Sequence, residues 1–211
     1  MRDKILSTYT GILIALNVLA FFVFFILIGY SPTTISLVAL QPAAALAGKN
    51  LWTFLTSMFM HGSFTHLLVN MISLMFIGGF VEKLIGKKRF LWLYLSGGLF
   101  AGLLFVIVSM LTKSDLNVYA VGASGAIFCL GGLLAVLTPR LPVLVFFIIP
   151  MPMWMAMIGM LVIIWLASAA IGLPIGNVAH LGGLLVGLGY GFYLKKKYPR
   201  KTKMISRYFS R

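Results

Sequence analysis

The segment VGASGAIFCL at Val121–Leu130 places a serine inside a Gly-Ala-Ser-Gly sequence, directly before an apolar run long enough to begin a membrane helix. Ser124 is therefore expected at a helix start, where free backbone N–H groups and the positive end of the helix dipole favour a negative charge. Serine is also a common N-cap, and capping is the ordinary interpretation of such a residue taken alone. The rest of the chain favours a second role, because its only three histidines, His61, His66 and His180, lie at or near the starts of other apolar runs.

The composition is that of a protein that crosses a membrane several times. Of the 211 residues, 61% are hydrophobic and 9% are charged, and the mean hydropathy is +1.07, whereas soluble domains contain about 25% charged residues. A run of about 17–25 apolar residues can cross a bilayer. We predict an all-α membrane protein with six transmembrane helices in a single domain over residues 1–211, of which 194–211 form a basic tail. The expected spans are Tyr9–Gly29, His66–Val81, Phe90–Leu111, Gly125–Leu137, Met153–Ile171 and His180–Leu194.

The sequence also supports a structural prediction for each of three other segments. Leu141–Pro152 is apolar but contains three prolines, so an extended lead-in to the fifth helix is expected. The long loop Ser31–Thr65 is half apolar and holds a single charge, so we expect it to lie in the membrane interface with Trp52 as an aromatic anchor. The first span follows Arg2 and Lys4 as a signal peptide would, but its apolar run is too long, and we expect it to be retained.

The net charge of +14 is distributed unevenly about the expected spans. Six spans place all but two of the 17 lysines and arginines on one side, and only Lys49 and Lys113 on the other. The larger set is Arg2, Lys4, Lys83, Lys87, Lys88, Arg89, Arg140, Lys195, Lys196, Lys197, Arg200, Lys201, Lys203, Arg207 and Arg211. By the positive-inside rule, both termini are expected in the cytoplasm of a multi-pass cell-membrane protein. The same placement argues against a nucleic-acid partner and predicts that the basic tail contacts anionic lipid headgroups.

This topology brings three polar side chains to a similar depth. The second, fourth and sixth helices all begin on the outer side, where the chain carries His66, Ser124 and His180. Polar groups inside a membrane are costly, and they mostly face the bundle interior or a water-filled cavity. We therefore expect the three residues to share one wet cavity below the outer surface.

Polar residues along the second helix have distinct expected roles. His66 and Asn70 are four residues apart and project from one face of the helix. An asparagine there commonly bonds a neighbouring helix, but together with the histidine it could also present two donors to an oxyanion. His61 is expected to be an interfacial side chain that satisfies loop backbone. Glu82, beside Lys83, is expected to form an ion pair at the inner face.

Glycines recur every fourth residue along the sixth helix and form a ridge on which another helix can pack closely. Because His180 shares that face, whatever packs on the ridge is brought near the imidazole. The Ser124 segment is the expected partner, and Phe128, one turn later, can pack against the group that pairs with the serine. A pure packing role for the ridge stays open. The ridge glycines are Gly183, Gly187 and Gly191, and those of the partner segment are Gly122, Gly125, Gly131 and Gly132.

A nucleophilic serine needs a base, and a neutral imidazole such as that of His180 is the usual one. The three acidic residues of the chain, Asp3, Glu82 and Asp115, all lie outside the outer halves of the spans. A Ser-His dyad without an orienting carboxylate is therefore expected. Three histidines could bind zinc, but the H-E-x-x-H spacing and a carboxylate base are both lacking. No metal and no cofactor are predicted.

With these motifs the chain resembles the rhomboid intramembrane serine proteases, from Trp52 to Gly191. The resemblance implies that Ser124 is the nucleophile and His180 the general base. It also implies an oxyanion hole made by His66, Asn70 and the Ser124 N–H, and an aromatic ring, here Phe128, stacked on the catalytic histidine. The family commonly has Trp-Arg where this chain has Trp52-Thr53, so the loop contacts of that arginine are not expected here. The matching motifs are His61, the His66/Asn70 pair, G-x-S-G at Gly122–Gly125 and A-H-x-x-G-x-x-x-G at Ala179–Gly187.

The expected function is that of an intramembrane serine endopeptidase, which cuts membrane-anchored proteins in or near a transmembrane segment. A helical substrate must unwind locally to expose a peptide bond, so small or helix-destabilising residues are expected at the cut. Activity is expected to fall below about pH 6.5, where an unperturbed imidazole is protonated. Two alternatives stay open: a non-catalytic rhomboid-like protein that binds membrane clients, and a small transporter, although the chain lacks the internal repeats typical of one.

Overall fold

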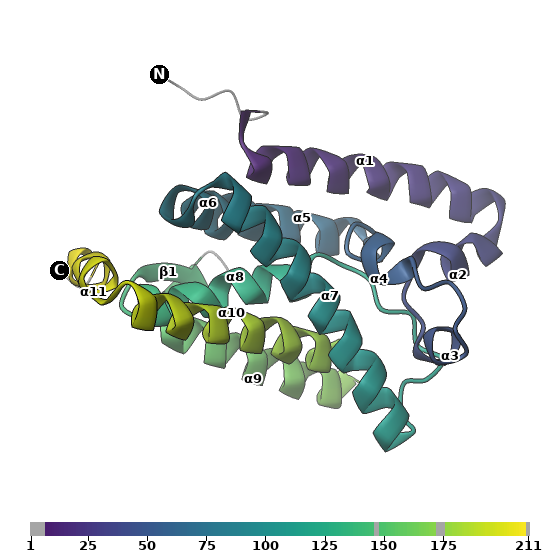
Figure 1. Cartoon of the computed structure of the whole chain (residues 1–211). Helices are drawn as coiled ribbons and strands as arrows, with labels where there is room; N and C mark the ends of the chain where they lie inside the picture. The colour runs from purple at the N-terminus through teal and green to yellow at the C-terminus, as the bar shows by residue number, and fades with distance from the viewer. Residues whose placement is uncertain (1–6, 146–147, 172–175, 210–211) are drawn as a thin grey trace.

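The computed structural model describes residues 7–145, 148–171 and 176–209, and most of these are helical (Figure 1). Four of the described helical stretches are long and apolar enough to cross a membrane, namely Tyr9–Tyr30, Phe64–Ile85, Lys87–Thr112 and Met153–Ala170. The elements that build the body of the protein are α1 (Tyr9–Tyr30), α5 (Phe64–Ser73), η3 (Leu74–Gly78), α6 (Gly79–Ile85), α7 (Lys87–Thr112), α8 (Ser124–Leu137), α9 (Met153–Ile171), α10 (Asn177–Lys197) and α11 (Pro199–Tyr208). Of the residues used in the charge argument, Arg2, Lys4 and Arg211 lie outside the described part of the chain, as does Asp3.

The second predicted span is one helix with a local widening. It begins at Phe64, where the hydroxyl of Ser63 accepts a hydrogen bond from the His66 N–H (3.1 Å) and caps the first turn. Between α5 and α6, the η3 segment has π-helical geometry, which inserts one extra residue per turn. The helix therefore extends beyond the predicted His66–Val81 at both ends.

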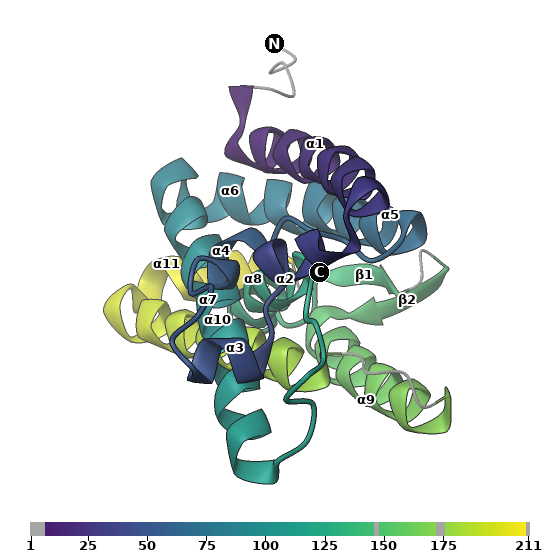
Figure 2. The same ribbon diagram turned by 90° about the vertical axis from the view of Figure 1, so that its right-hand side faces the viewer.

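Helix α8 occupies the centre of the protein and is short. Twelve of its 14 residues are buried, since α7, α9, α10 and the α5–η3 helix pack around it (Figure 2). An α-helix of this length rises only about 21 Å, which is less than the ~30 Å hydrocarbon core of a bilayer. Its start at Ser124 is therefore expected to lie below the membrane surface if its other end reaches the opposite interface.

The glycine ridge of α10 packs on α8, as predicted. A Cβ added at Gly183 would collide with the carbonyl oxygen of Gly125, and one added at Gly187 would collide with that of Cys129. These glycines are needed because the two helix backbones are in direct contact.

On the α8 side of this contact, Gly131 and Gly132 were both expected to face α10, and only one of them does. A Cβ at Gly132 would lie 2.6 Å from the carbonyl oxygen of Leu184 on α10, so Gly132 belongs to the contact. Gly131 faces Met157 of α9 instead. The two adjacent glycines therefore serve two different helix contacts.

The long loop after α1 is ordered by short helices and by hydrogen bonds between them. Trp52 donates from its indole N–H to the carbonyl of Leu37 (2.8 Å), and the hydroxyl of Thr53 donates to the carbonyl of Asn50 (2.7 Å). Thr53 is buried, so it supplies a local contact at the position where the family commonly has arginine. The short helices are η2 (Pro32–Thr34), α2 (Ile35–Val38), α3 (Pro42–Leu46) and α4 (Thr53–Thr56).

Two sequence expectations about the ends of the helices require correction. The segment expected as a lead-in to the fifth helix is extended, but it forms an antiparallel hairpin of β1 (Pro142–Val145) and β2 (Ile149–Pro152), so the protein is not purely α-helical. In this two-stranded sheet both strands are edge strands, and edge strands tolerate proline. Glu82 forms no ion pair with a described residue, and its carboxylate instead accepts hydrogen bonds from the backbone N–H groups of Tyr9 and Thr10 (2.9 and 2.8 Å). It caps the start of α1, where a negative charge is favoured.

Candidate functional site

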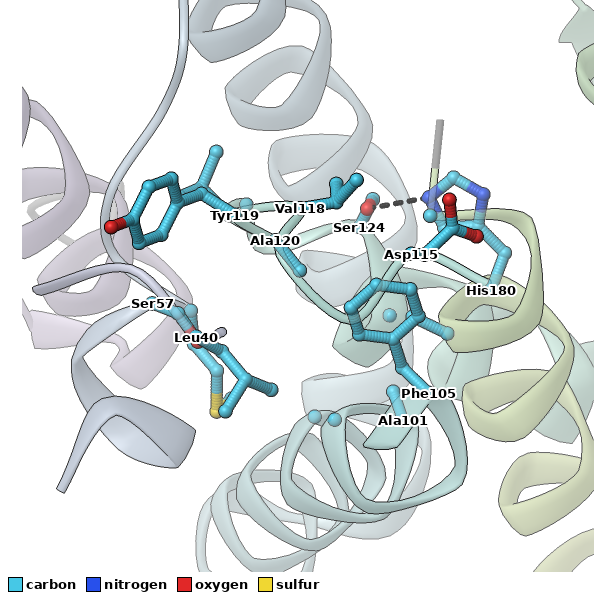
Figure 3. A pocket seen from close by; sticks show the side chains of 18 of the residues that line it. Leu40, Ser57, Ala101, Phe105, Asp115, Val118, Tyr119, Ala120, Ser124 and His180 are labelled. Atoms are coloured by element: carbon cyan, nitrogen blue, oxygen red, sulfur yellow. Dashed lines mark hydrogen bonds between the residues drawn. The ribbon is translucent and has the colours of Figure 1, made fainter. Parts of the chain in front are cut away.

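Ser124 and His180 meet at the starts of two helices that are far apart in sequence. Ala123 is the N-cap of α8 and makes no side-chain cap, so the Ser124 hydroxyl is not used to cap its own helix. Instead, Ser124 Oγ lies 2.7 Å from His180 Nε2, in the first turn of α10 (Figure 3). This distance is that of a hydrogen bond, and it gives the serine a direct route to lose its proton.

The His180 ring is oriented by packing. The ring of Phe128 stacks on it at a centroid distance of 4.7 Å and an interplanar angle of 21°. His180 is buried, and its Nδ1 has no hydrogen-bond partner. The imidazole is therefore positioned by the serine at one nitrogen and by an aromatic face, with no carboxylate at the other nitrogen.

Gly122 brings His66 close to the serine. Its φ of +120° is one that residues with side chains rarely adopt, and its N–H donates to the carbonyl of Ser57 (2.8 Å). A Cβ at Gly122 would lie 2.9 Å from Nε2 of His66 and 3.8 Å from Ser124 Oγ. The imidazole of His66 thus lies against the backbone two residues before Ser124, where only glycine leaves room for it.

Asn70, the second residue of the predicted pair, forms a hydrogen bond within its own helix. It is buried, and its Nδ2 donates to the carbonyl of His66 one turn earlier (2.9 Å). It does not line the cavity that holds Ser124 and His66. One of its two amide hydrogens is free of that bond, so a second donor stays available to a neighbouring group.

A cavity of about 470 Å³ lies beside the two helix starts (Figure 3). Ser124, His180 and His66 line it together, so the three residues predicted to share a cavity do so. Small residues of α7 and apolar residues of the loop after α1 form the opposite wall. The other lining residues are Leu40, Ser57, Met58, Gly98, Ala101, Gly102, Phe105, Asp115, Val118, Tyr119, Ala120, Val121, Gly122, Gly125, Gly176 and Ala179.

Most of this wall could not be identified from the sequence. Leu40 pairs through its backbone with Ala120 in an isolated β-bridge, which brings the first loop to the segment before α8. Asp115, which follows the expected third span, also lines the cavity, and it is the only carboxylate among the described lining residues. Its position depends on how the chain turns after α7, and no local sequence pattern indicates that turn.

His61 is not the interfacial side chain that the sequence suggested. It is only 4% exposed, and its ring packs edge-on against that of His66 at a centroid distance of 5.0 Å. Both ring nitrogens are buried, and neither makes a hydrogen bond of good geometry. Burial, together with the neighbouring His66, lowers the pKa of His61 to about 4, and the backbone of Phe59 opposes this shift only in part. His61 is therefore a neutral packing partner of His66 at physiological pH.

Comparison with known proteins shows that the chain is similar to members of one family. The rhomboid domain model matches residues 48–197. Over 165 residues the chain is 37% identical to RHOMBOID-like protein 5 of Arabidopsis thaliana, covering 77% of this chain and 50% of that protein. It is 32% identical over 188 residues to rhomboid protease GluP of Bacillus subtilis (85% and 33%) and 30% identical over 151 residues to the mitochondrial rhomboid protein 1 of Saccharomyces cerevisiae (70% and 43%). The chain thus spans half or less of the length of these relatives.

Proposed function

This chain belongs to the rhomboid family, and we propose that it is an intramembrane serine endopeptidase that cleaves membrane-anchored proteins in or near a transmembrane segment. The observation that carries the proposal is the 2.7 Å contact between Ser124 Oγ and His180 Nε2 inside a cavity. A partly buried serine hydroxyl that contacts an imidazole, with open space beside it, is the arrangement that nucleophilic catalysis requires.

The reaction follows from the two side chains. Nε2 of His180 takes the proton of the Ser124 hydroxyl as Oγ attacks the carbonyl carbon of the scissile peptide bond. The imidazolium then gives that proton to the leaving amide nitrogen, and the C–N bond breaks to leave an acyl-serine. A water molecule, deprotonated by the same imidazole, attacks the ester carbonyl and releases the second product with regeneration of the hydroxyl.

The negative charge that develops on the carbonyl oxygen needs donors in place before the reaction. His66 is the best-placed side chain, because its ring lies against Gly122 and lines the same cavity as Ser124. The backbone N–H of Ser124 is at the start of α8, where the helix leaves such groups without an intrahelical partner. Asn70 acts with His66, either by donating its second amide hydrogen or by fixing the first turn of α5 through its bond to the His66 carbonyl.

The proposed topology has six spans, formed by α1, the continuous α5–η3–α6 helix, α7, α8, α9 and α10, with both termini in the cytoplasm. The four long apolar helices and the charge distribution support it. In this arrangement the loop after α1 lies in the outer interface, and the cavity opens toward the outer side. Because α8 is shorter than the bilayer core, water can reach Ser124 without crossing hydrocarbon.

The test is cleavage of a membrane-anchored reporter by purified protein, with Ser124→Ala and His180→Ala as inactive variants. Ser96→Ala on α7 is a matched control, since Ser96 bonds only the carbonyl of Leu93 in its own helix and does not line the cavity. We expect cleavage by the wild type and the control, and none by the two dyad variants. Labelling of Ser124 by a fluorophosphonate should in addition require His180. Cleavage that survives Ser124→Ala would refute the proposal, whereas client binding without cleavage by the wild type would favour the non-catalytic alternative.

A further inference from the structure

A second, smaller cavity lies between α8, α9 and α10, at the end of the bundle opposite to the dyad. Its volume is about 270 Å³, and its wall is apolar except for one charged residue, Lys195. Along α10 the lining runs from Leu184 to Lys195, which is about 16 Å of helix. The cavity is therefore a groove with the length of an extended acyl chain of about a dozen carbons.

The groove faces the lipid side of the bundle. Helix α9 is the least buried of the four long apolar helices, so one wall is formed by a helix with most of its surface free. The side chains of Ile158 and Phe192 line the groove and are more than half exposed. Trp154, in the first turn of α9, also lines the groove, and its backbone N–H donates to the carbonyl of Pro139 (3.3 Å). An indole at this level is typical of the membrane interface, where headgroups begin.

No acidic side chain in the described part of the chain forms an ion pair with the cations at this end of the protein. Of the described acidic residues, Glu82 is engaged with the start of α1, and Asp115 lines the dyad cavity at the other end. Lys195 is exposed and has an exposed lysine, Lys196, beside it. The positive field is extended by α11, which turns away from the axis of α10 (Figure 1). Exposed cations here also include Lys197, Arg200, Lys201, Lys203 and Arg207.

We propose that this groove binds one anionic phospholipid, with an acyl chain between α8, α9 and α10 and the phosphate at Lys195. Such a lipid needs an apolar groove long enough for its acyl chain and a cation close to its phosphate. This groove has both, with Lys195 as the one cation among its described lining residues. The groove shares no lining residue with the dyad cavity, so the proposal does not depend on protease activity. Because the lipid contacts both α9 and the α8–α10 pair, its binding should also stabilise the fold.

The first test measures lipid binding by native mass spectrometry in detergent, with phosphatidylglycerol as the probe. Lys195→Gln should weaken binding by about five-fold, which corresponds to the ~1 kcal/mol typical of one basic residue at a membrane surface. Lys196→Gln is the matched control: it removes the same charge one residue away but does not line the groove, and binding should be nearly unchanged. Equal loss in the two variants would mean diffuse attraction and would overturn the proposal.

The second test addresses the acyl chain. Ala135→Phe fills the groove and keeps every cation, so it should abolish tight binding and the lipid-induced rise in thermal stability. Phosphatidylcholine and glycerol phosphate should bind more weakly than phosphatidylglycerol, since the first lacks net charge and the second lacks the chain. If Ala135→Phe does not fold, photoactivatable phosphatidylglycerol on the wild type should label groove residues such as Met157 or Leu188. Unaltered binding by the filled variant, or labelling confined to other faces, would overturn the proposal.

Discussion

Replacing Gly132 by alanine tests whether the contact between α8 and α10 sets the stability of the protein. The added Cβ would lie 2.6 Å from the carbonyl oxygen of Leu184 and 3.1 Å from the nitrogen of Leu188. A carbon–oxygen contact needs about 3.3 Å, so the two backbones must separate by roughly 0.7 Å. Overpacking of this kind costs about 1–3 kcal/mol, and the better helix propensity of alanine returns about 1 kcal/mol.

Gly189→Ala is the matched control for this experiment. Gly189 lies on α10, and a Cβ there would meet nothing within 4 Å. It receives the same gain in helix propensity without the collision, so the difference between the two variants isolates the packing cost. We expect the free energy of unfolding in mixed micelles to be about 1–3 kcal/mol lower for Gly132→Ala than for Gly189→Ala. Equal stability of the two variants would refute the claim that backbone contact between these helices is tight.

Three further changes test other contacts. Glu82→Gln should lower the free energy of unfolding by about 1.5–3 kcal/mol, because charged hydrogen bonds at the start of α1 become neutral ones; Asp115→Asn, at an exposed position, should not change it. His61 alone should lower the free energy of unfolding by roughly 2 kcal/mol between pH 7 and pH 5, because its pKa is about 4 in the fold against 6.5 unfolded, so its contribution is complete above pH 6.5 and is lost toward pH 4. The His61→Phe variant should therefore show a shallower slope in pH-dependent unfolding, and an unaltered slope would argue against the assignment. Phe128→Ala should reduce kcat by roughly two- to ten-fold, the value of an aromatic stack, with little change in KM; a normal kcat would mean that the ring does not position His180.

The parts of the fold that the sequence predicted are those set by long periodic patterns. The apolar runs gave the long helices to within a few residues, and the glycine ridge at Gly183 and Gly187 gave the α8–α10 contact, because both depend on residues within a single helix. The closeness of Ser124, His66 and His180 followed from topology, since helix starts on the same side must lie at similar depth. The remaining contacts depend on tertiary structure and could not be predicted from local sequence patterns.

The errors share a physical cause. Glu82 was expected to pair with nearby lysines, but the start of α1, more than seventy residues away, offers free N–H groups that bind a carboxylate more favourably than an exposed lysine does. His61 looked like a loop residue, and the loop folds back so that its ring packs on His66. The partner of Glu82 is distant in sequence, whereas His61 and His66 are only five residues apart, and no periodic pattern indicates that their rings meet. The position of Asp115 at the cavity and the pairing of the two strands at 142–152 likewise depend on how the chain turns, although the prolines there predicted extended backbone.

In the mechanism that we propose, the dyad makes catalysis depend directly on helix packing. In a serine–histidine–aspartate site, a carboxylate holds the imidazole in its orientation. Here Nδ1 of His180 is buried without a partner, so the ring is held by Phe128, by Ser124 and by the position of α10 on α8. A separation of only about 0.5 Å between these helices would stretch the Oγ–Nε2 distance from 2.7 Å to the ~3.2 Å limit of a hydrogen bond. The glycines that let the two backbones touch therefore fix the distance over which the proton must move, and a change that loosens the contact should reduce the rate before it unfolds the protein.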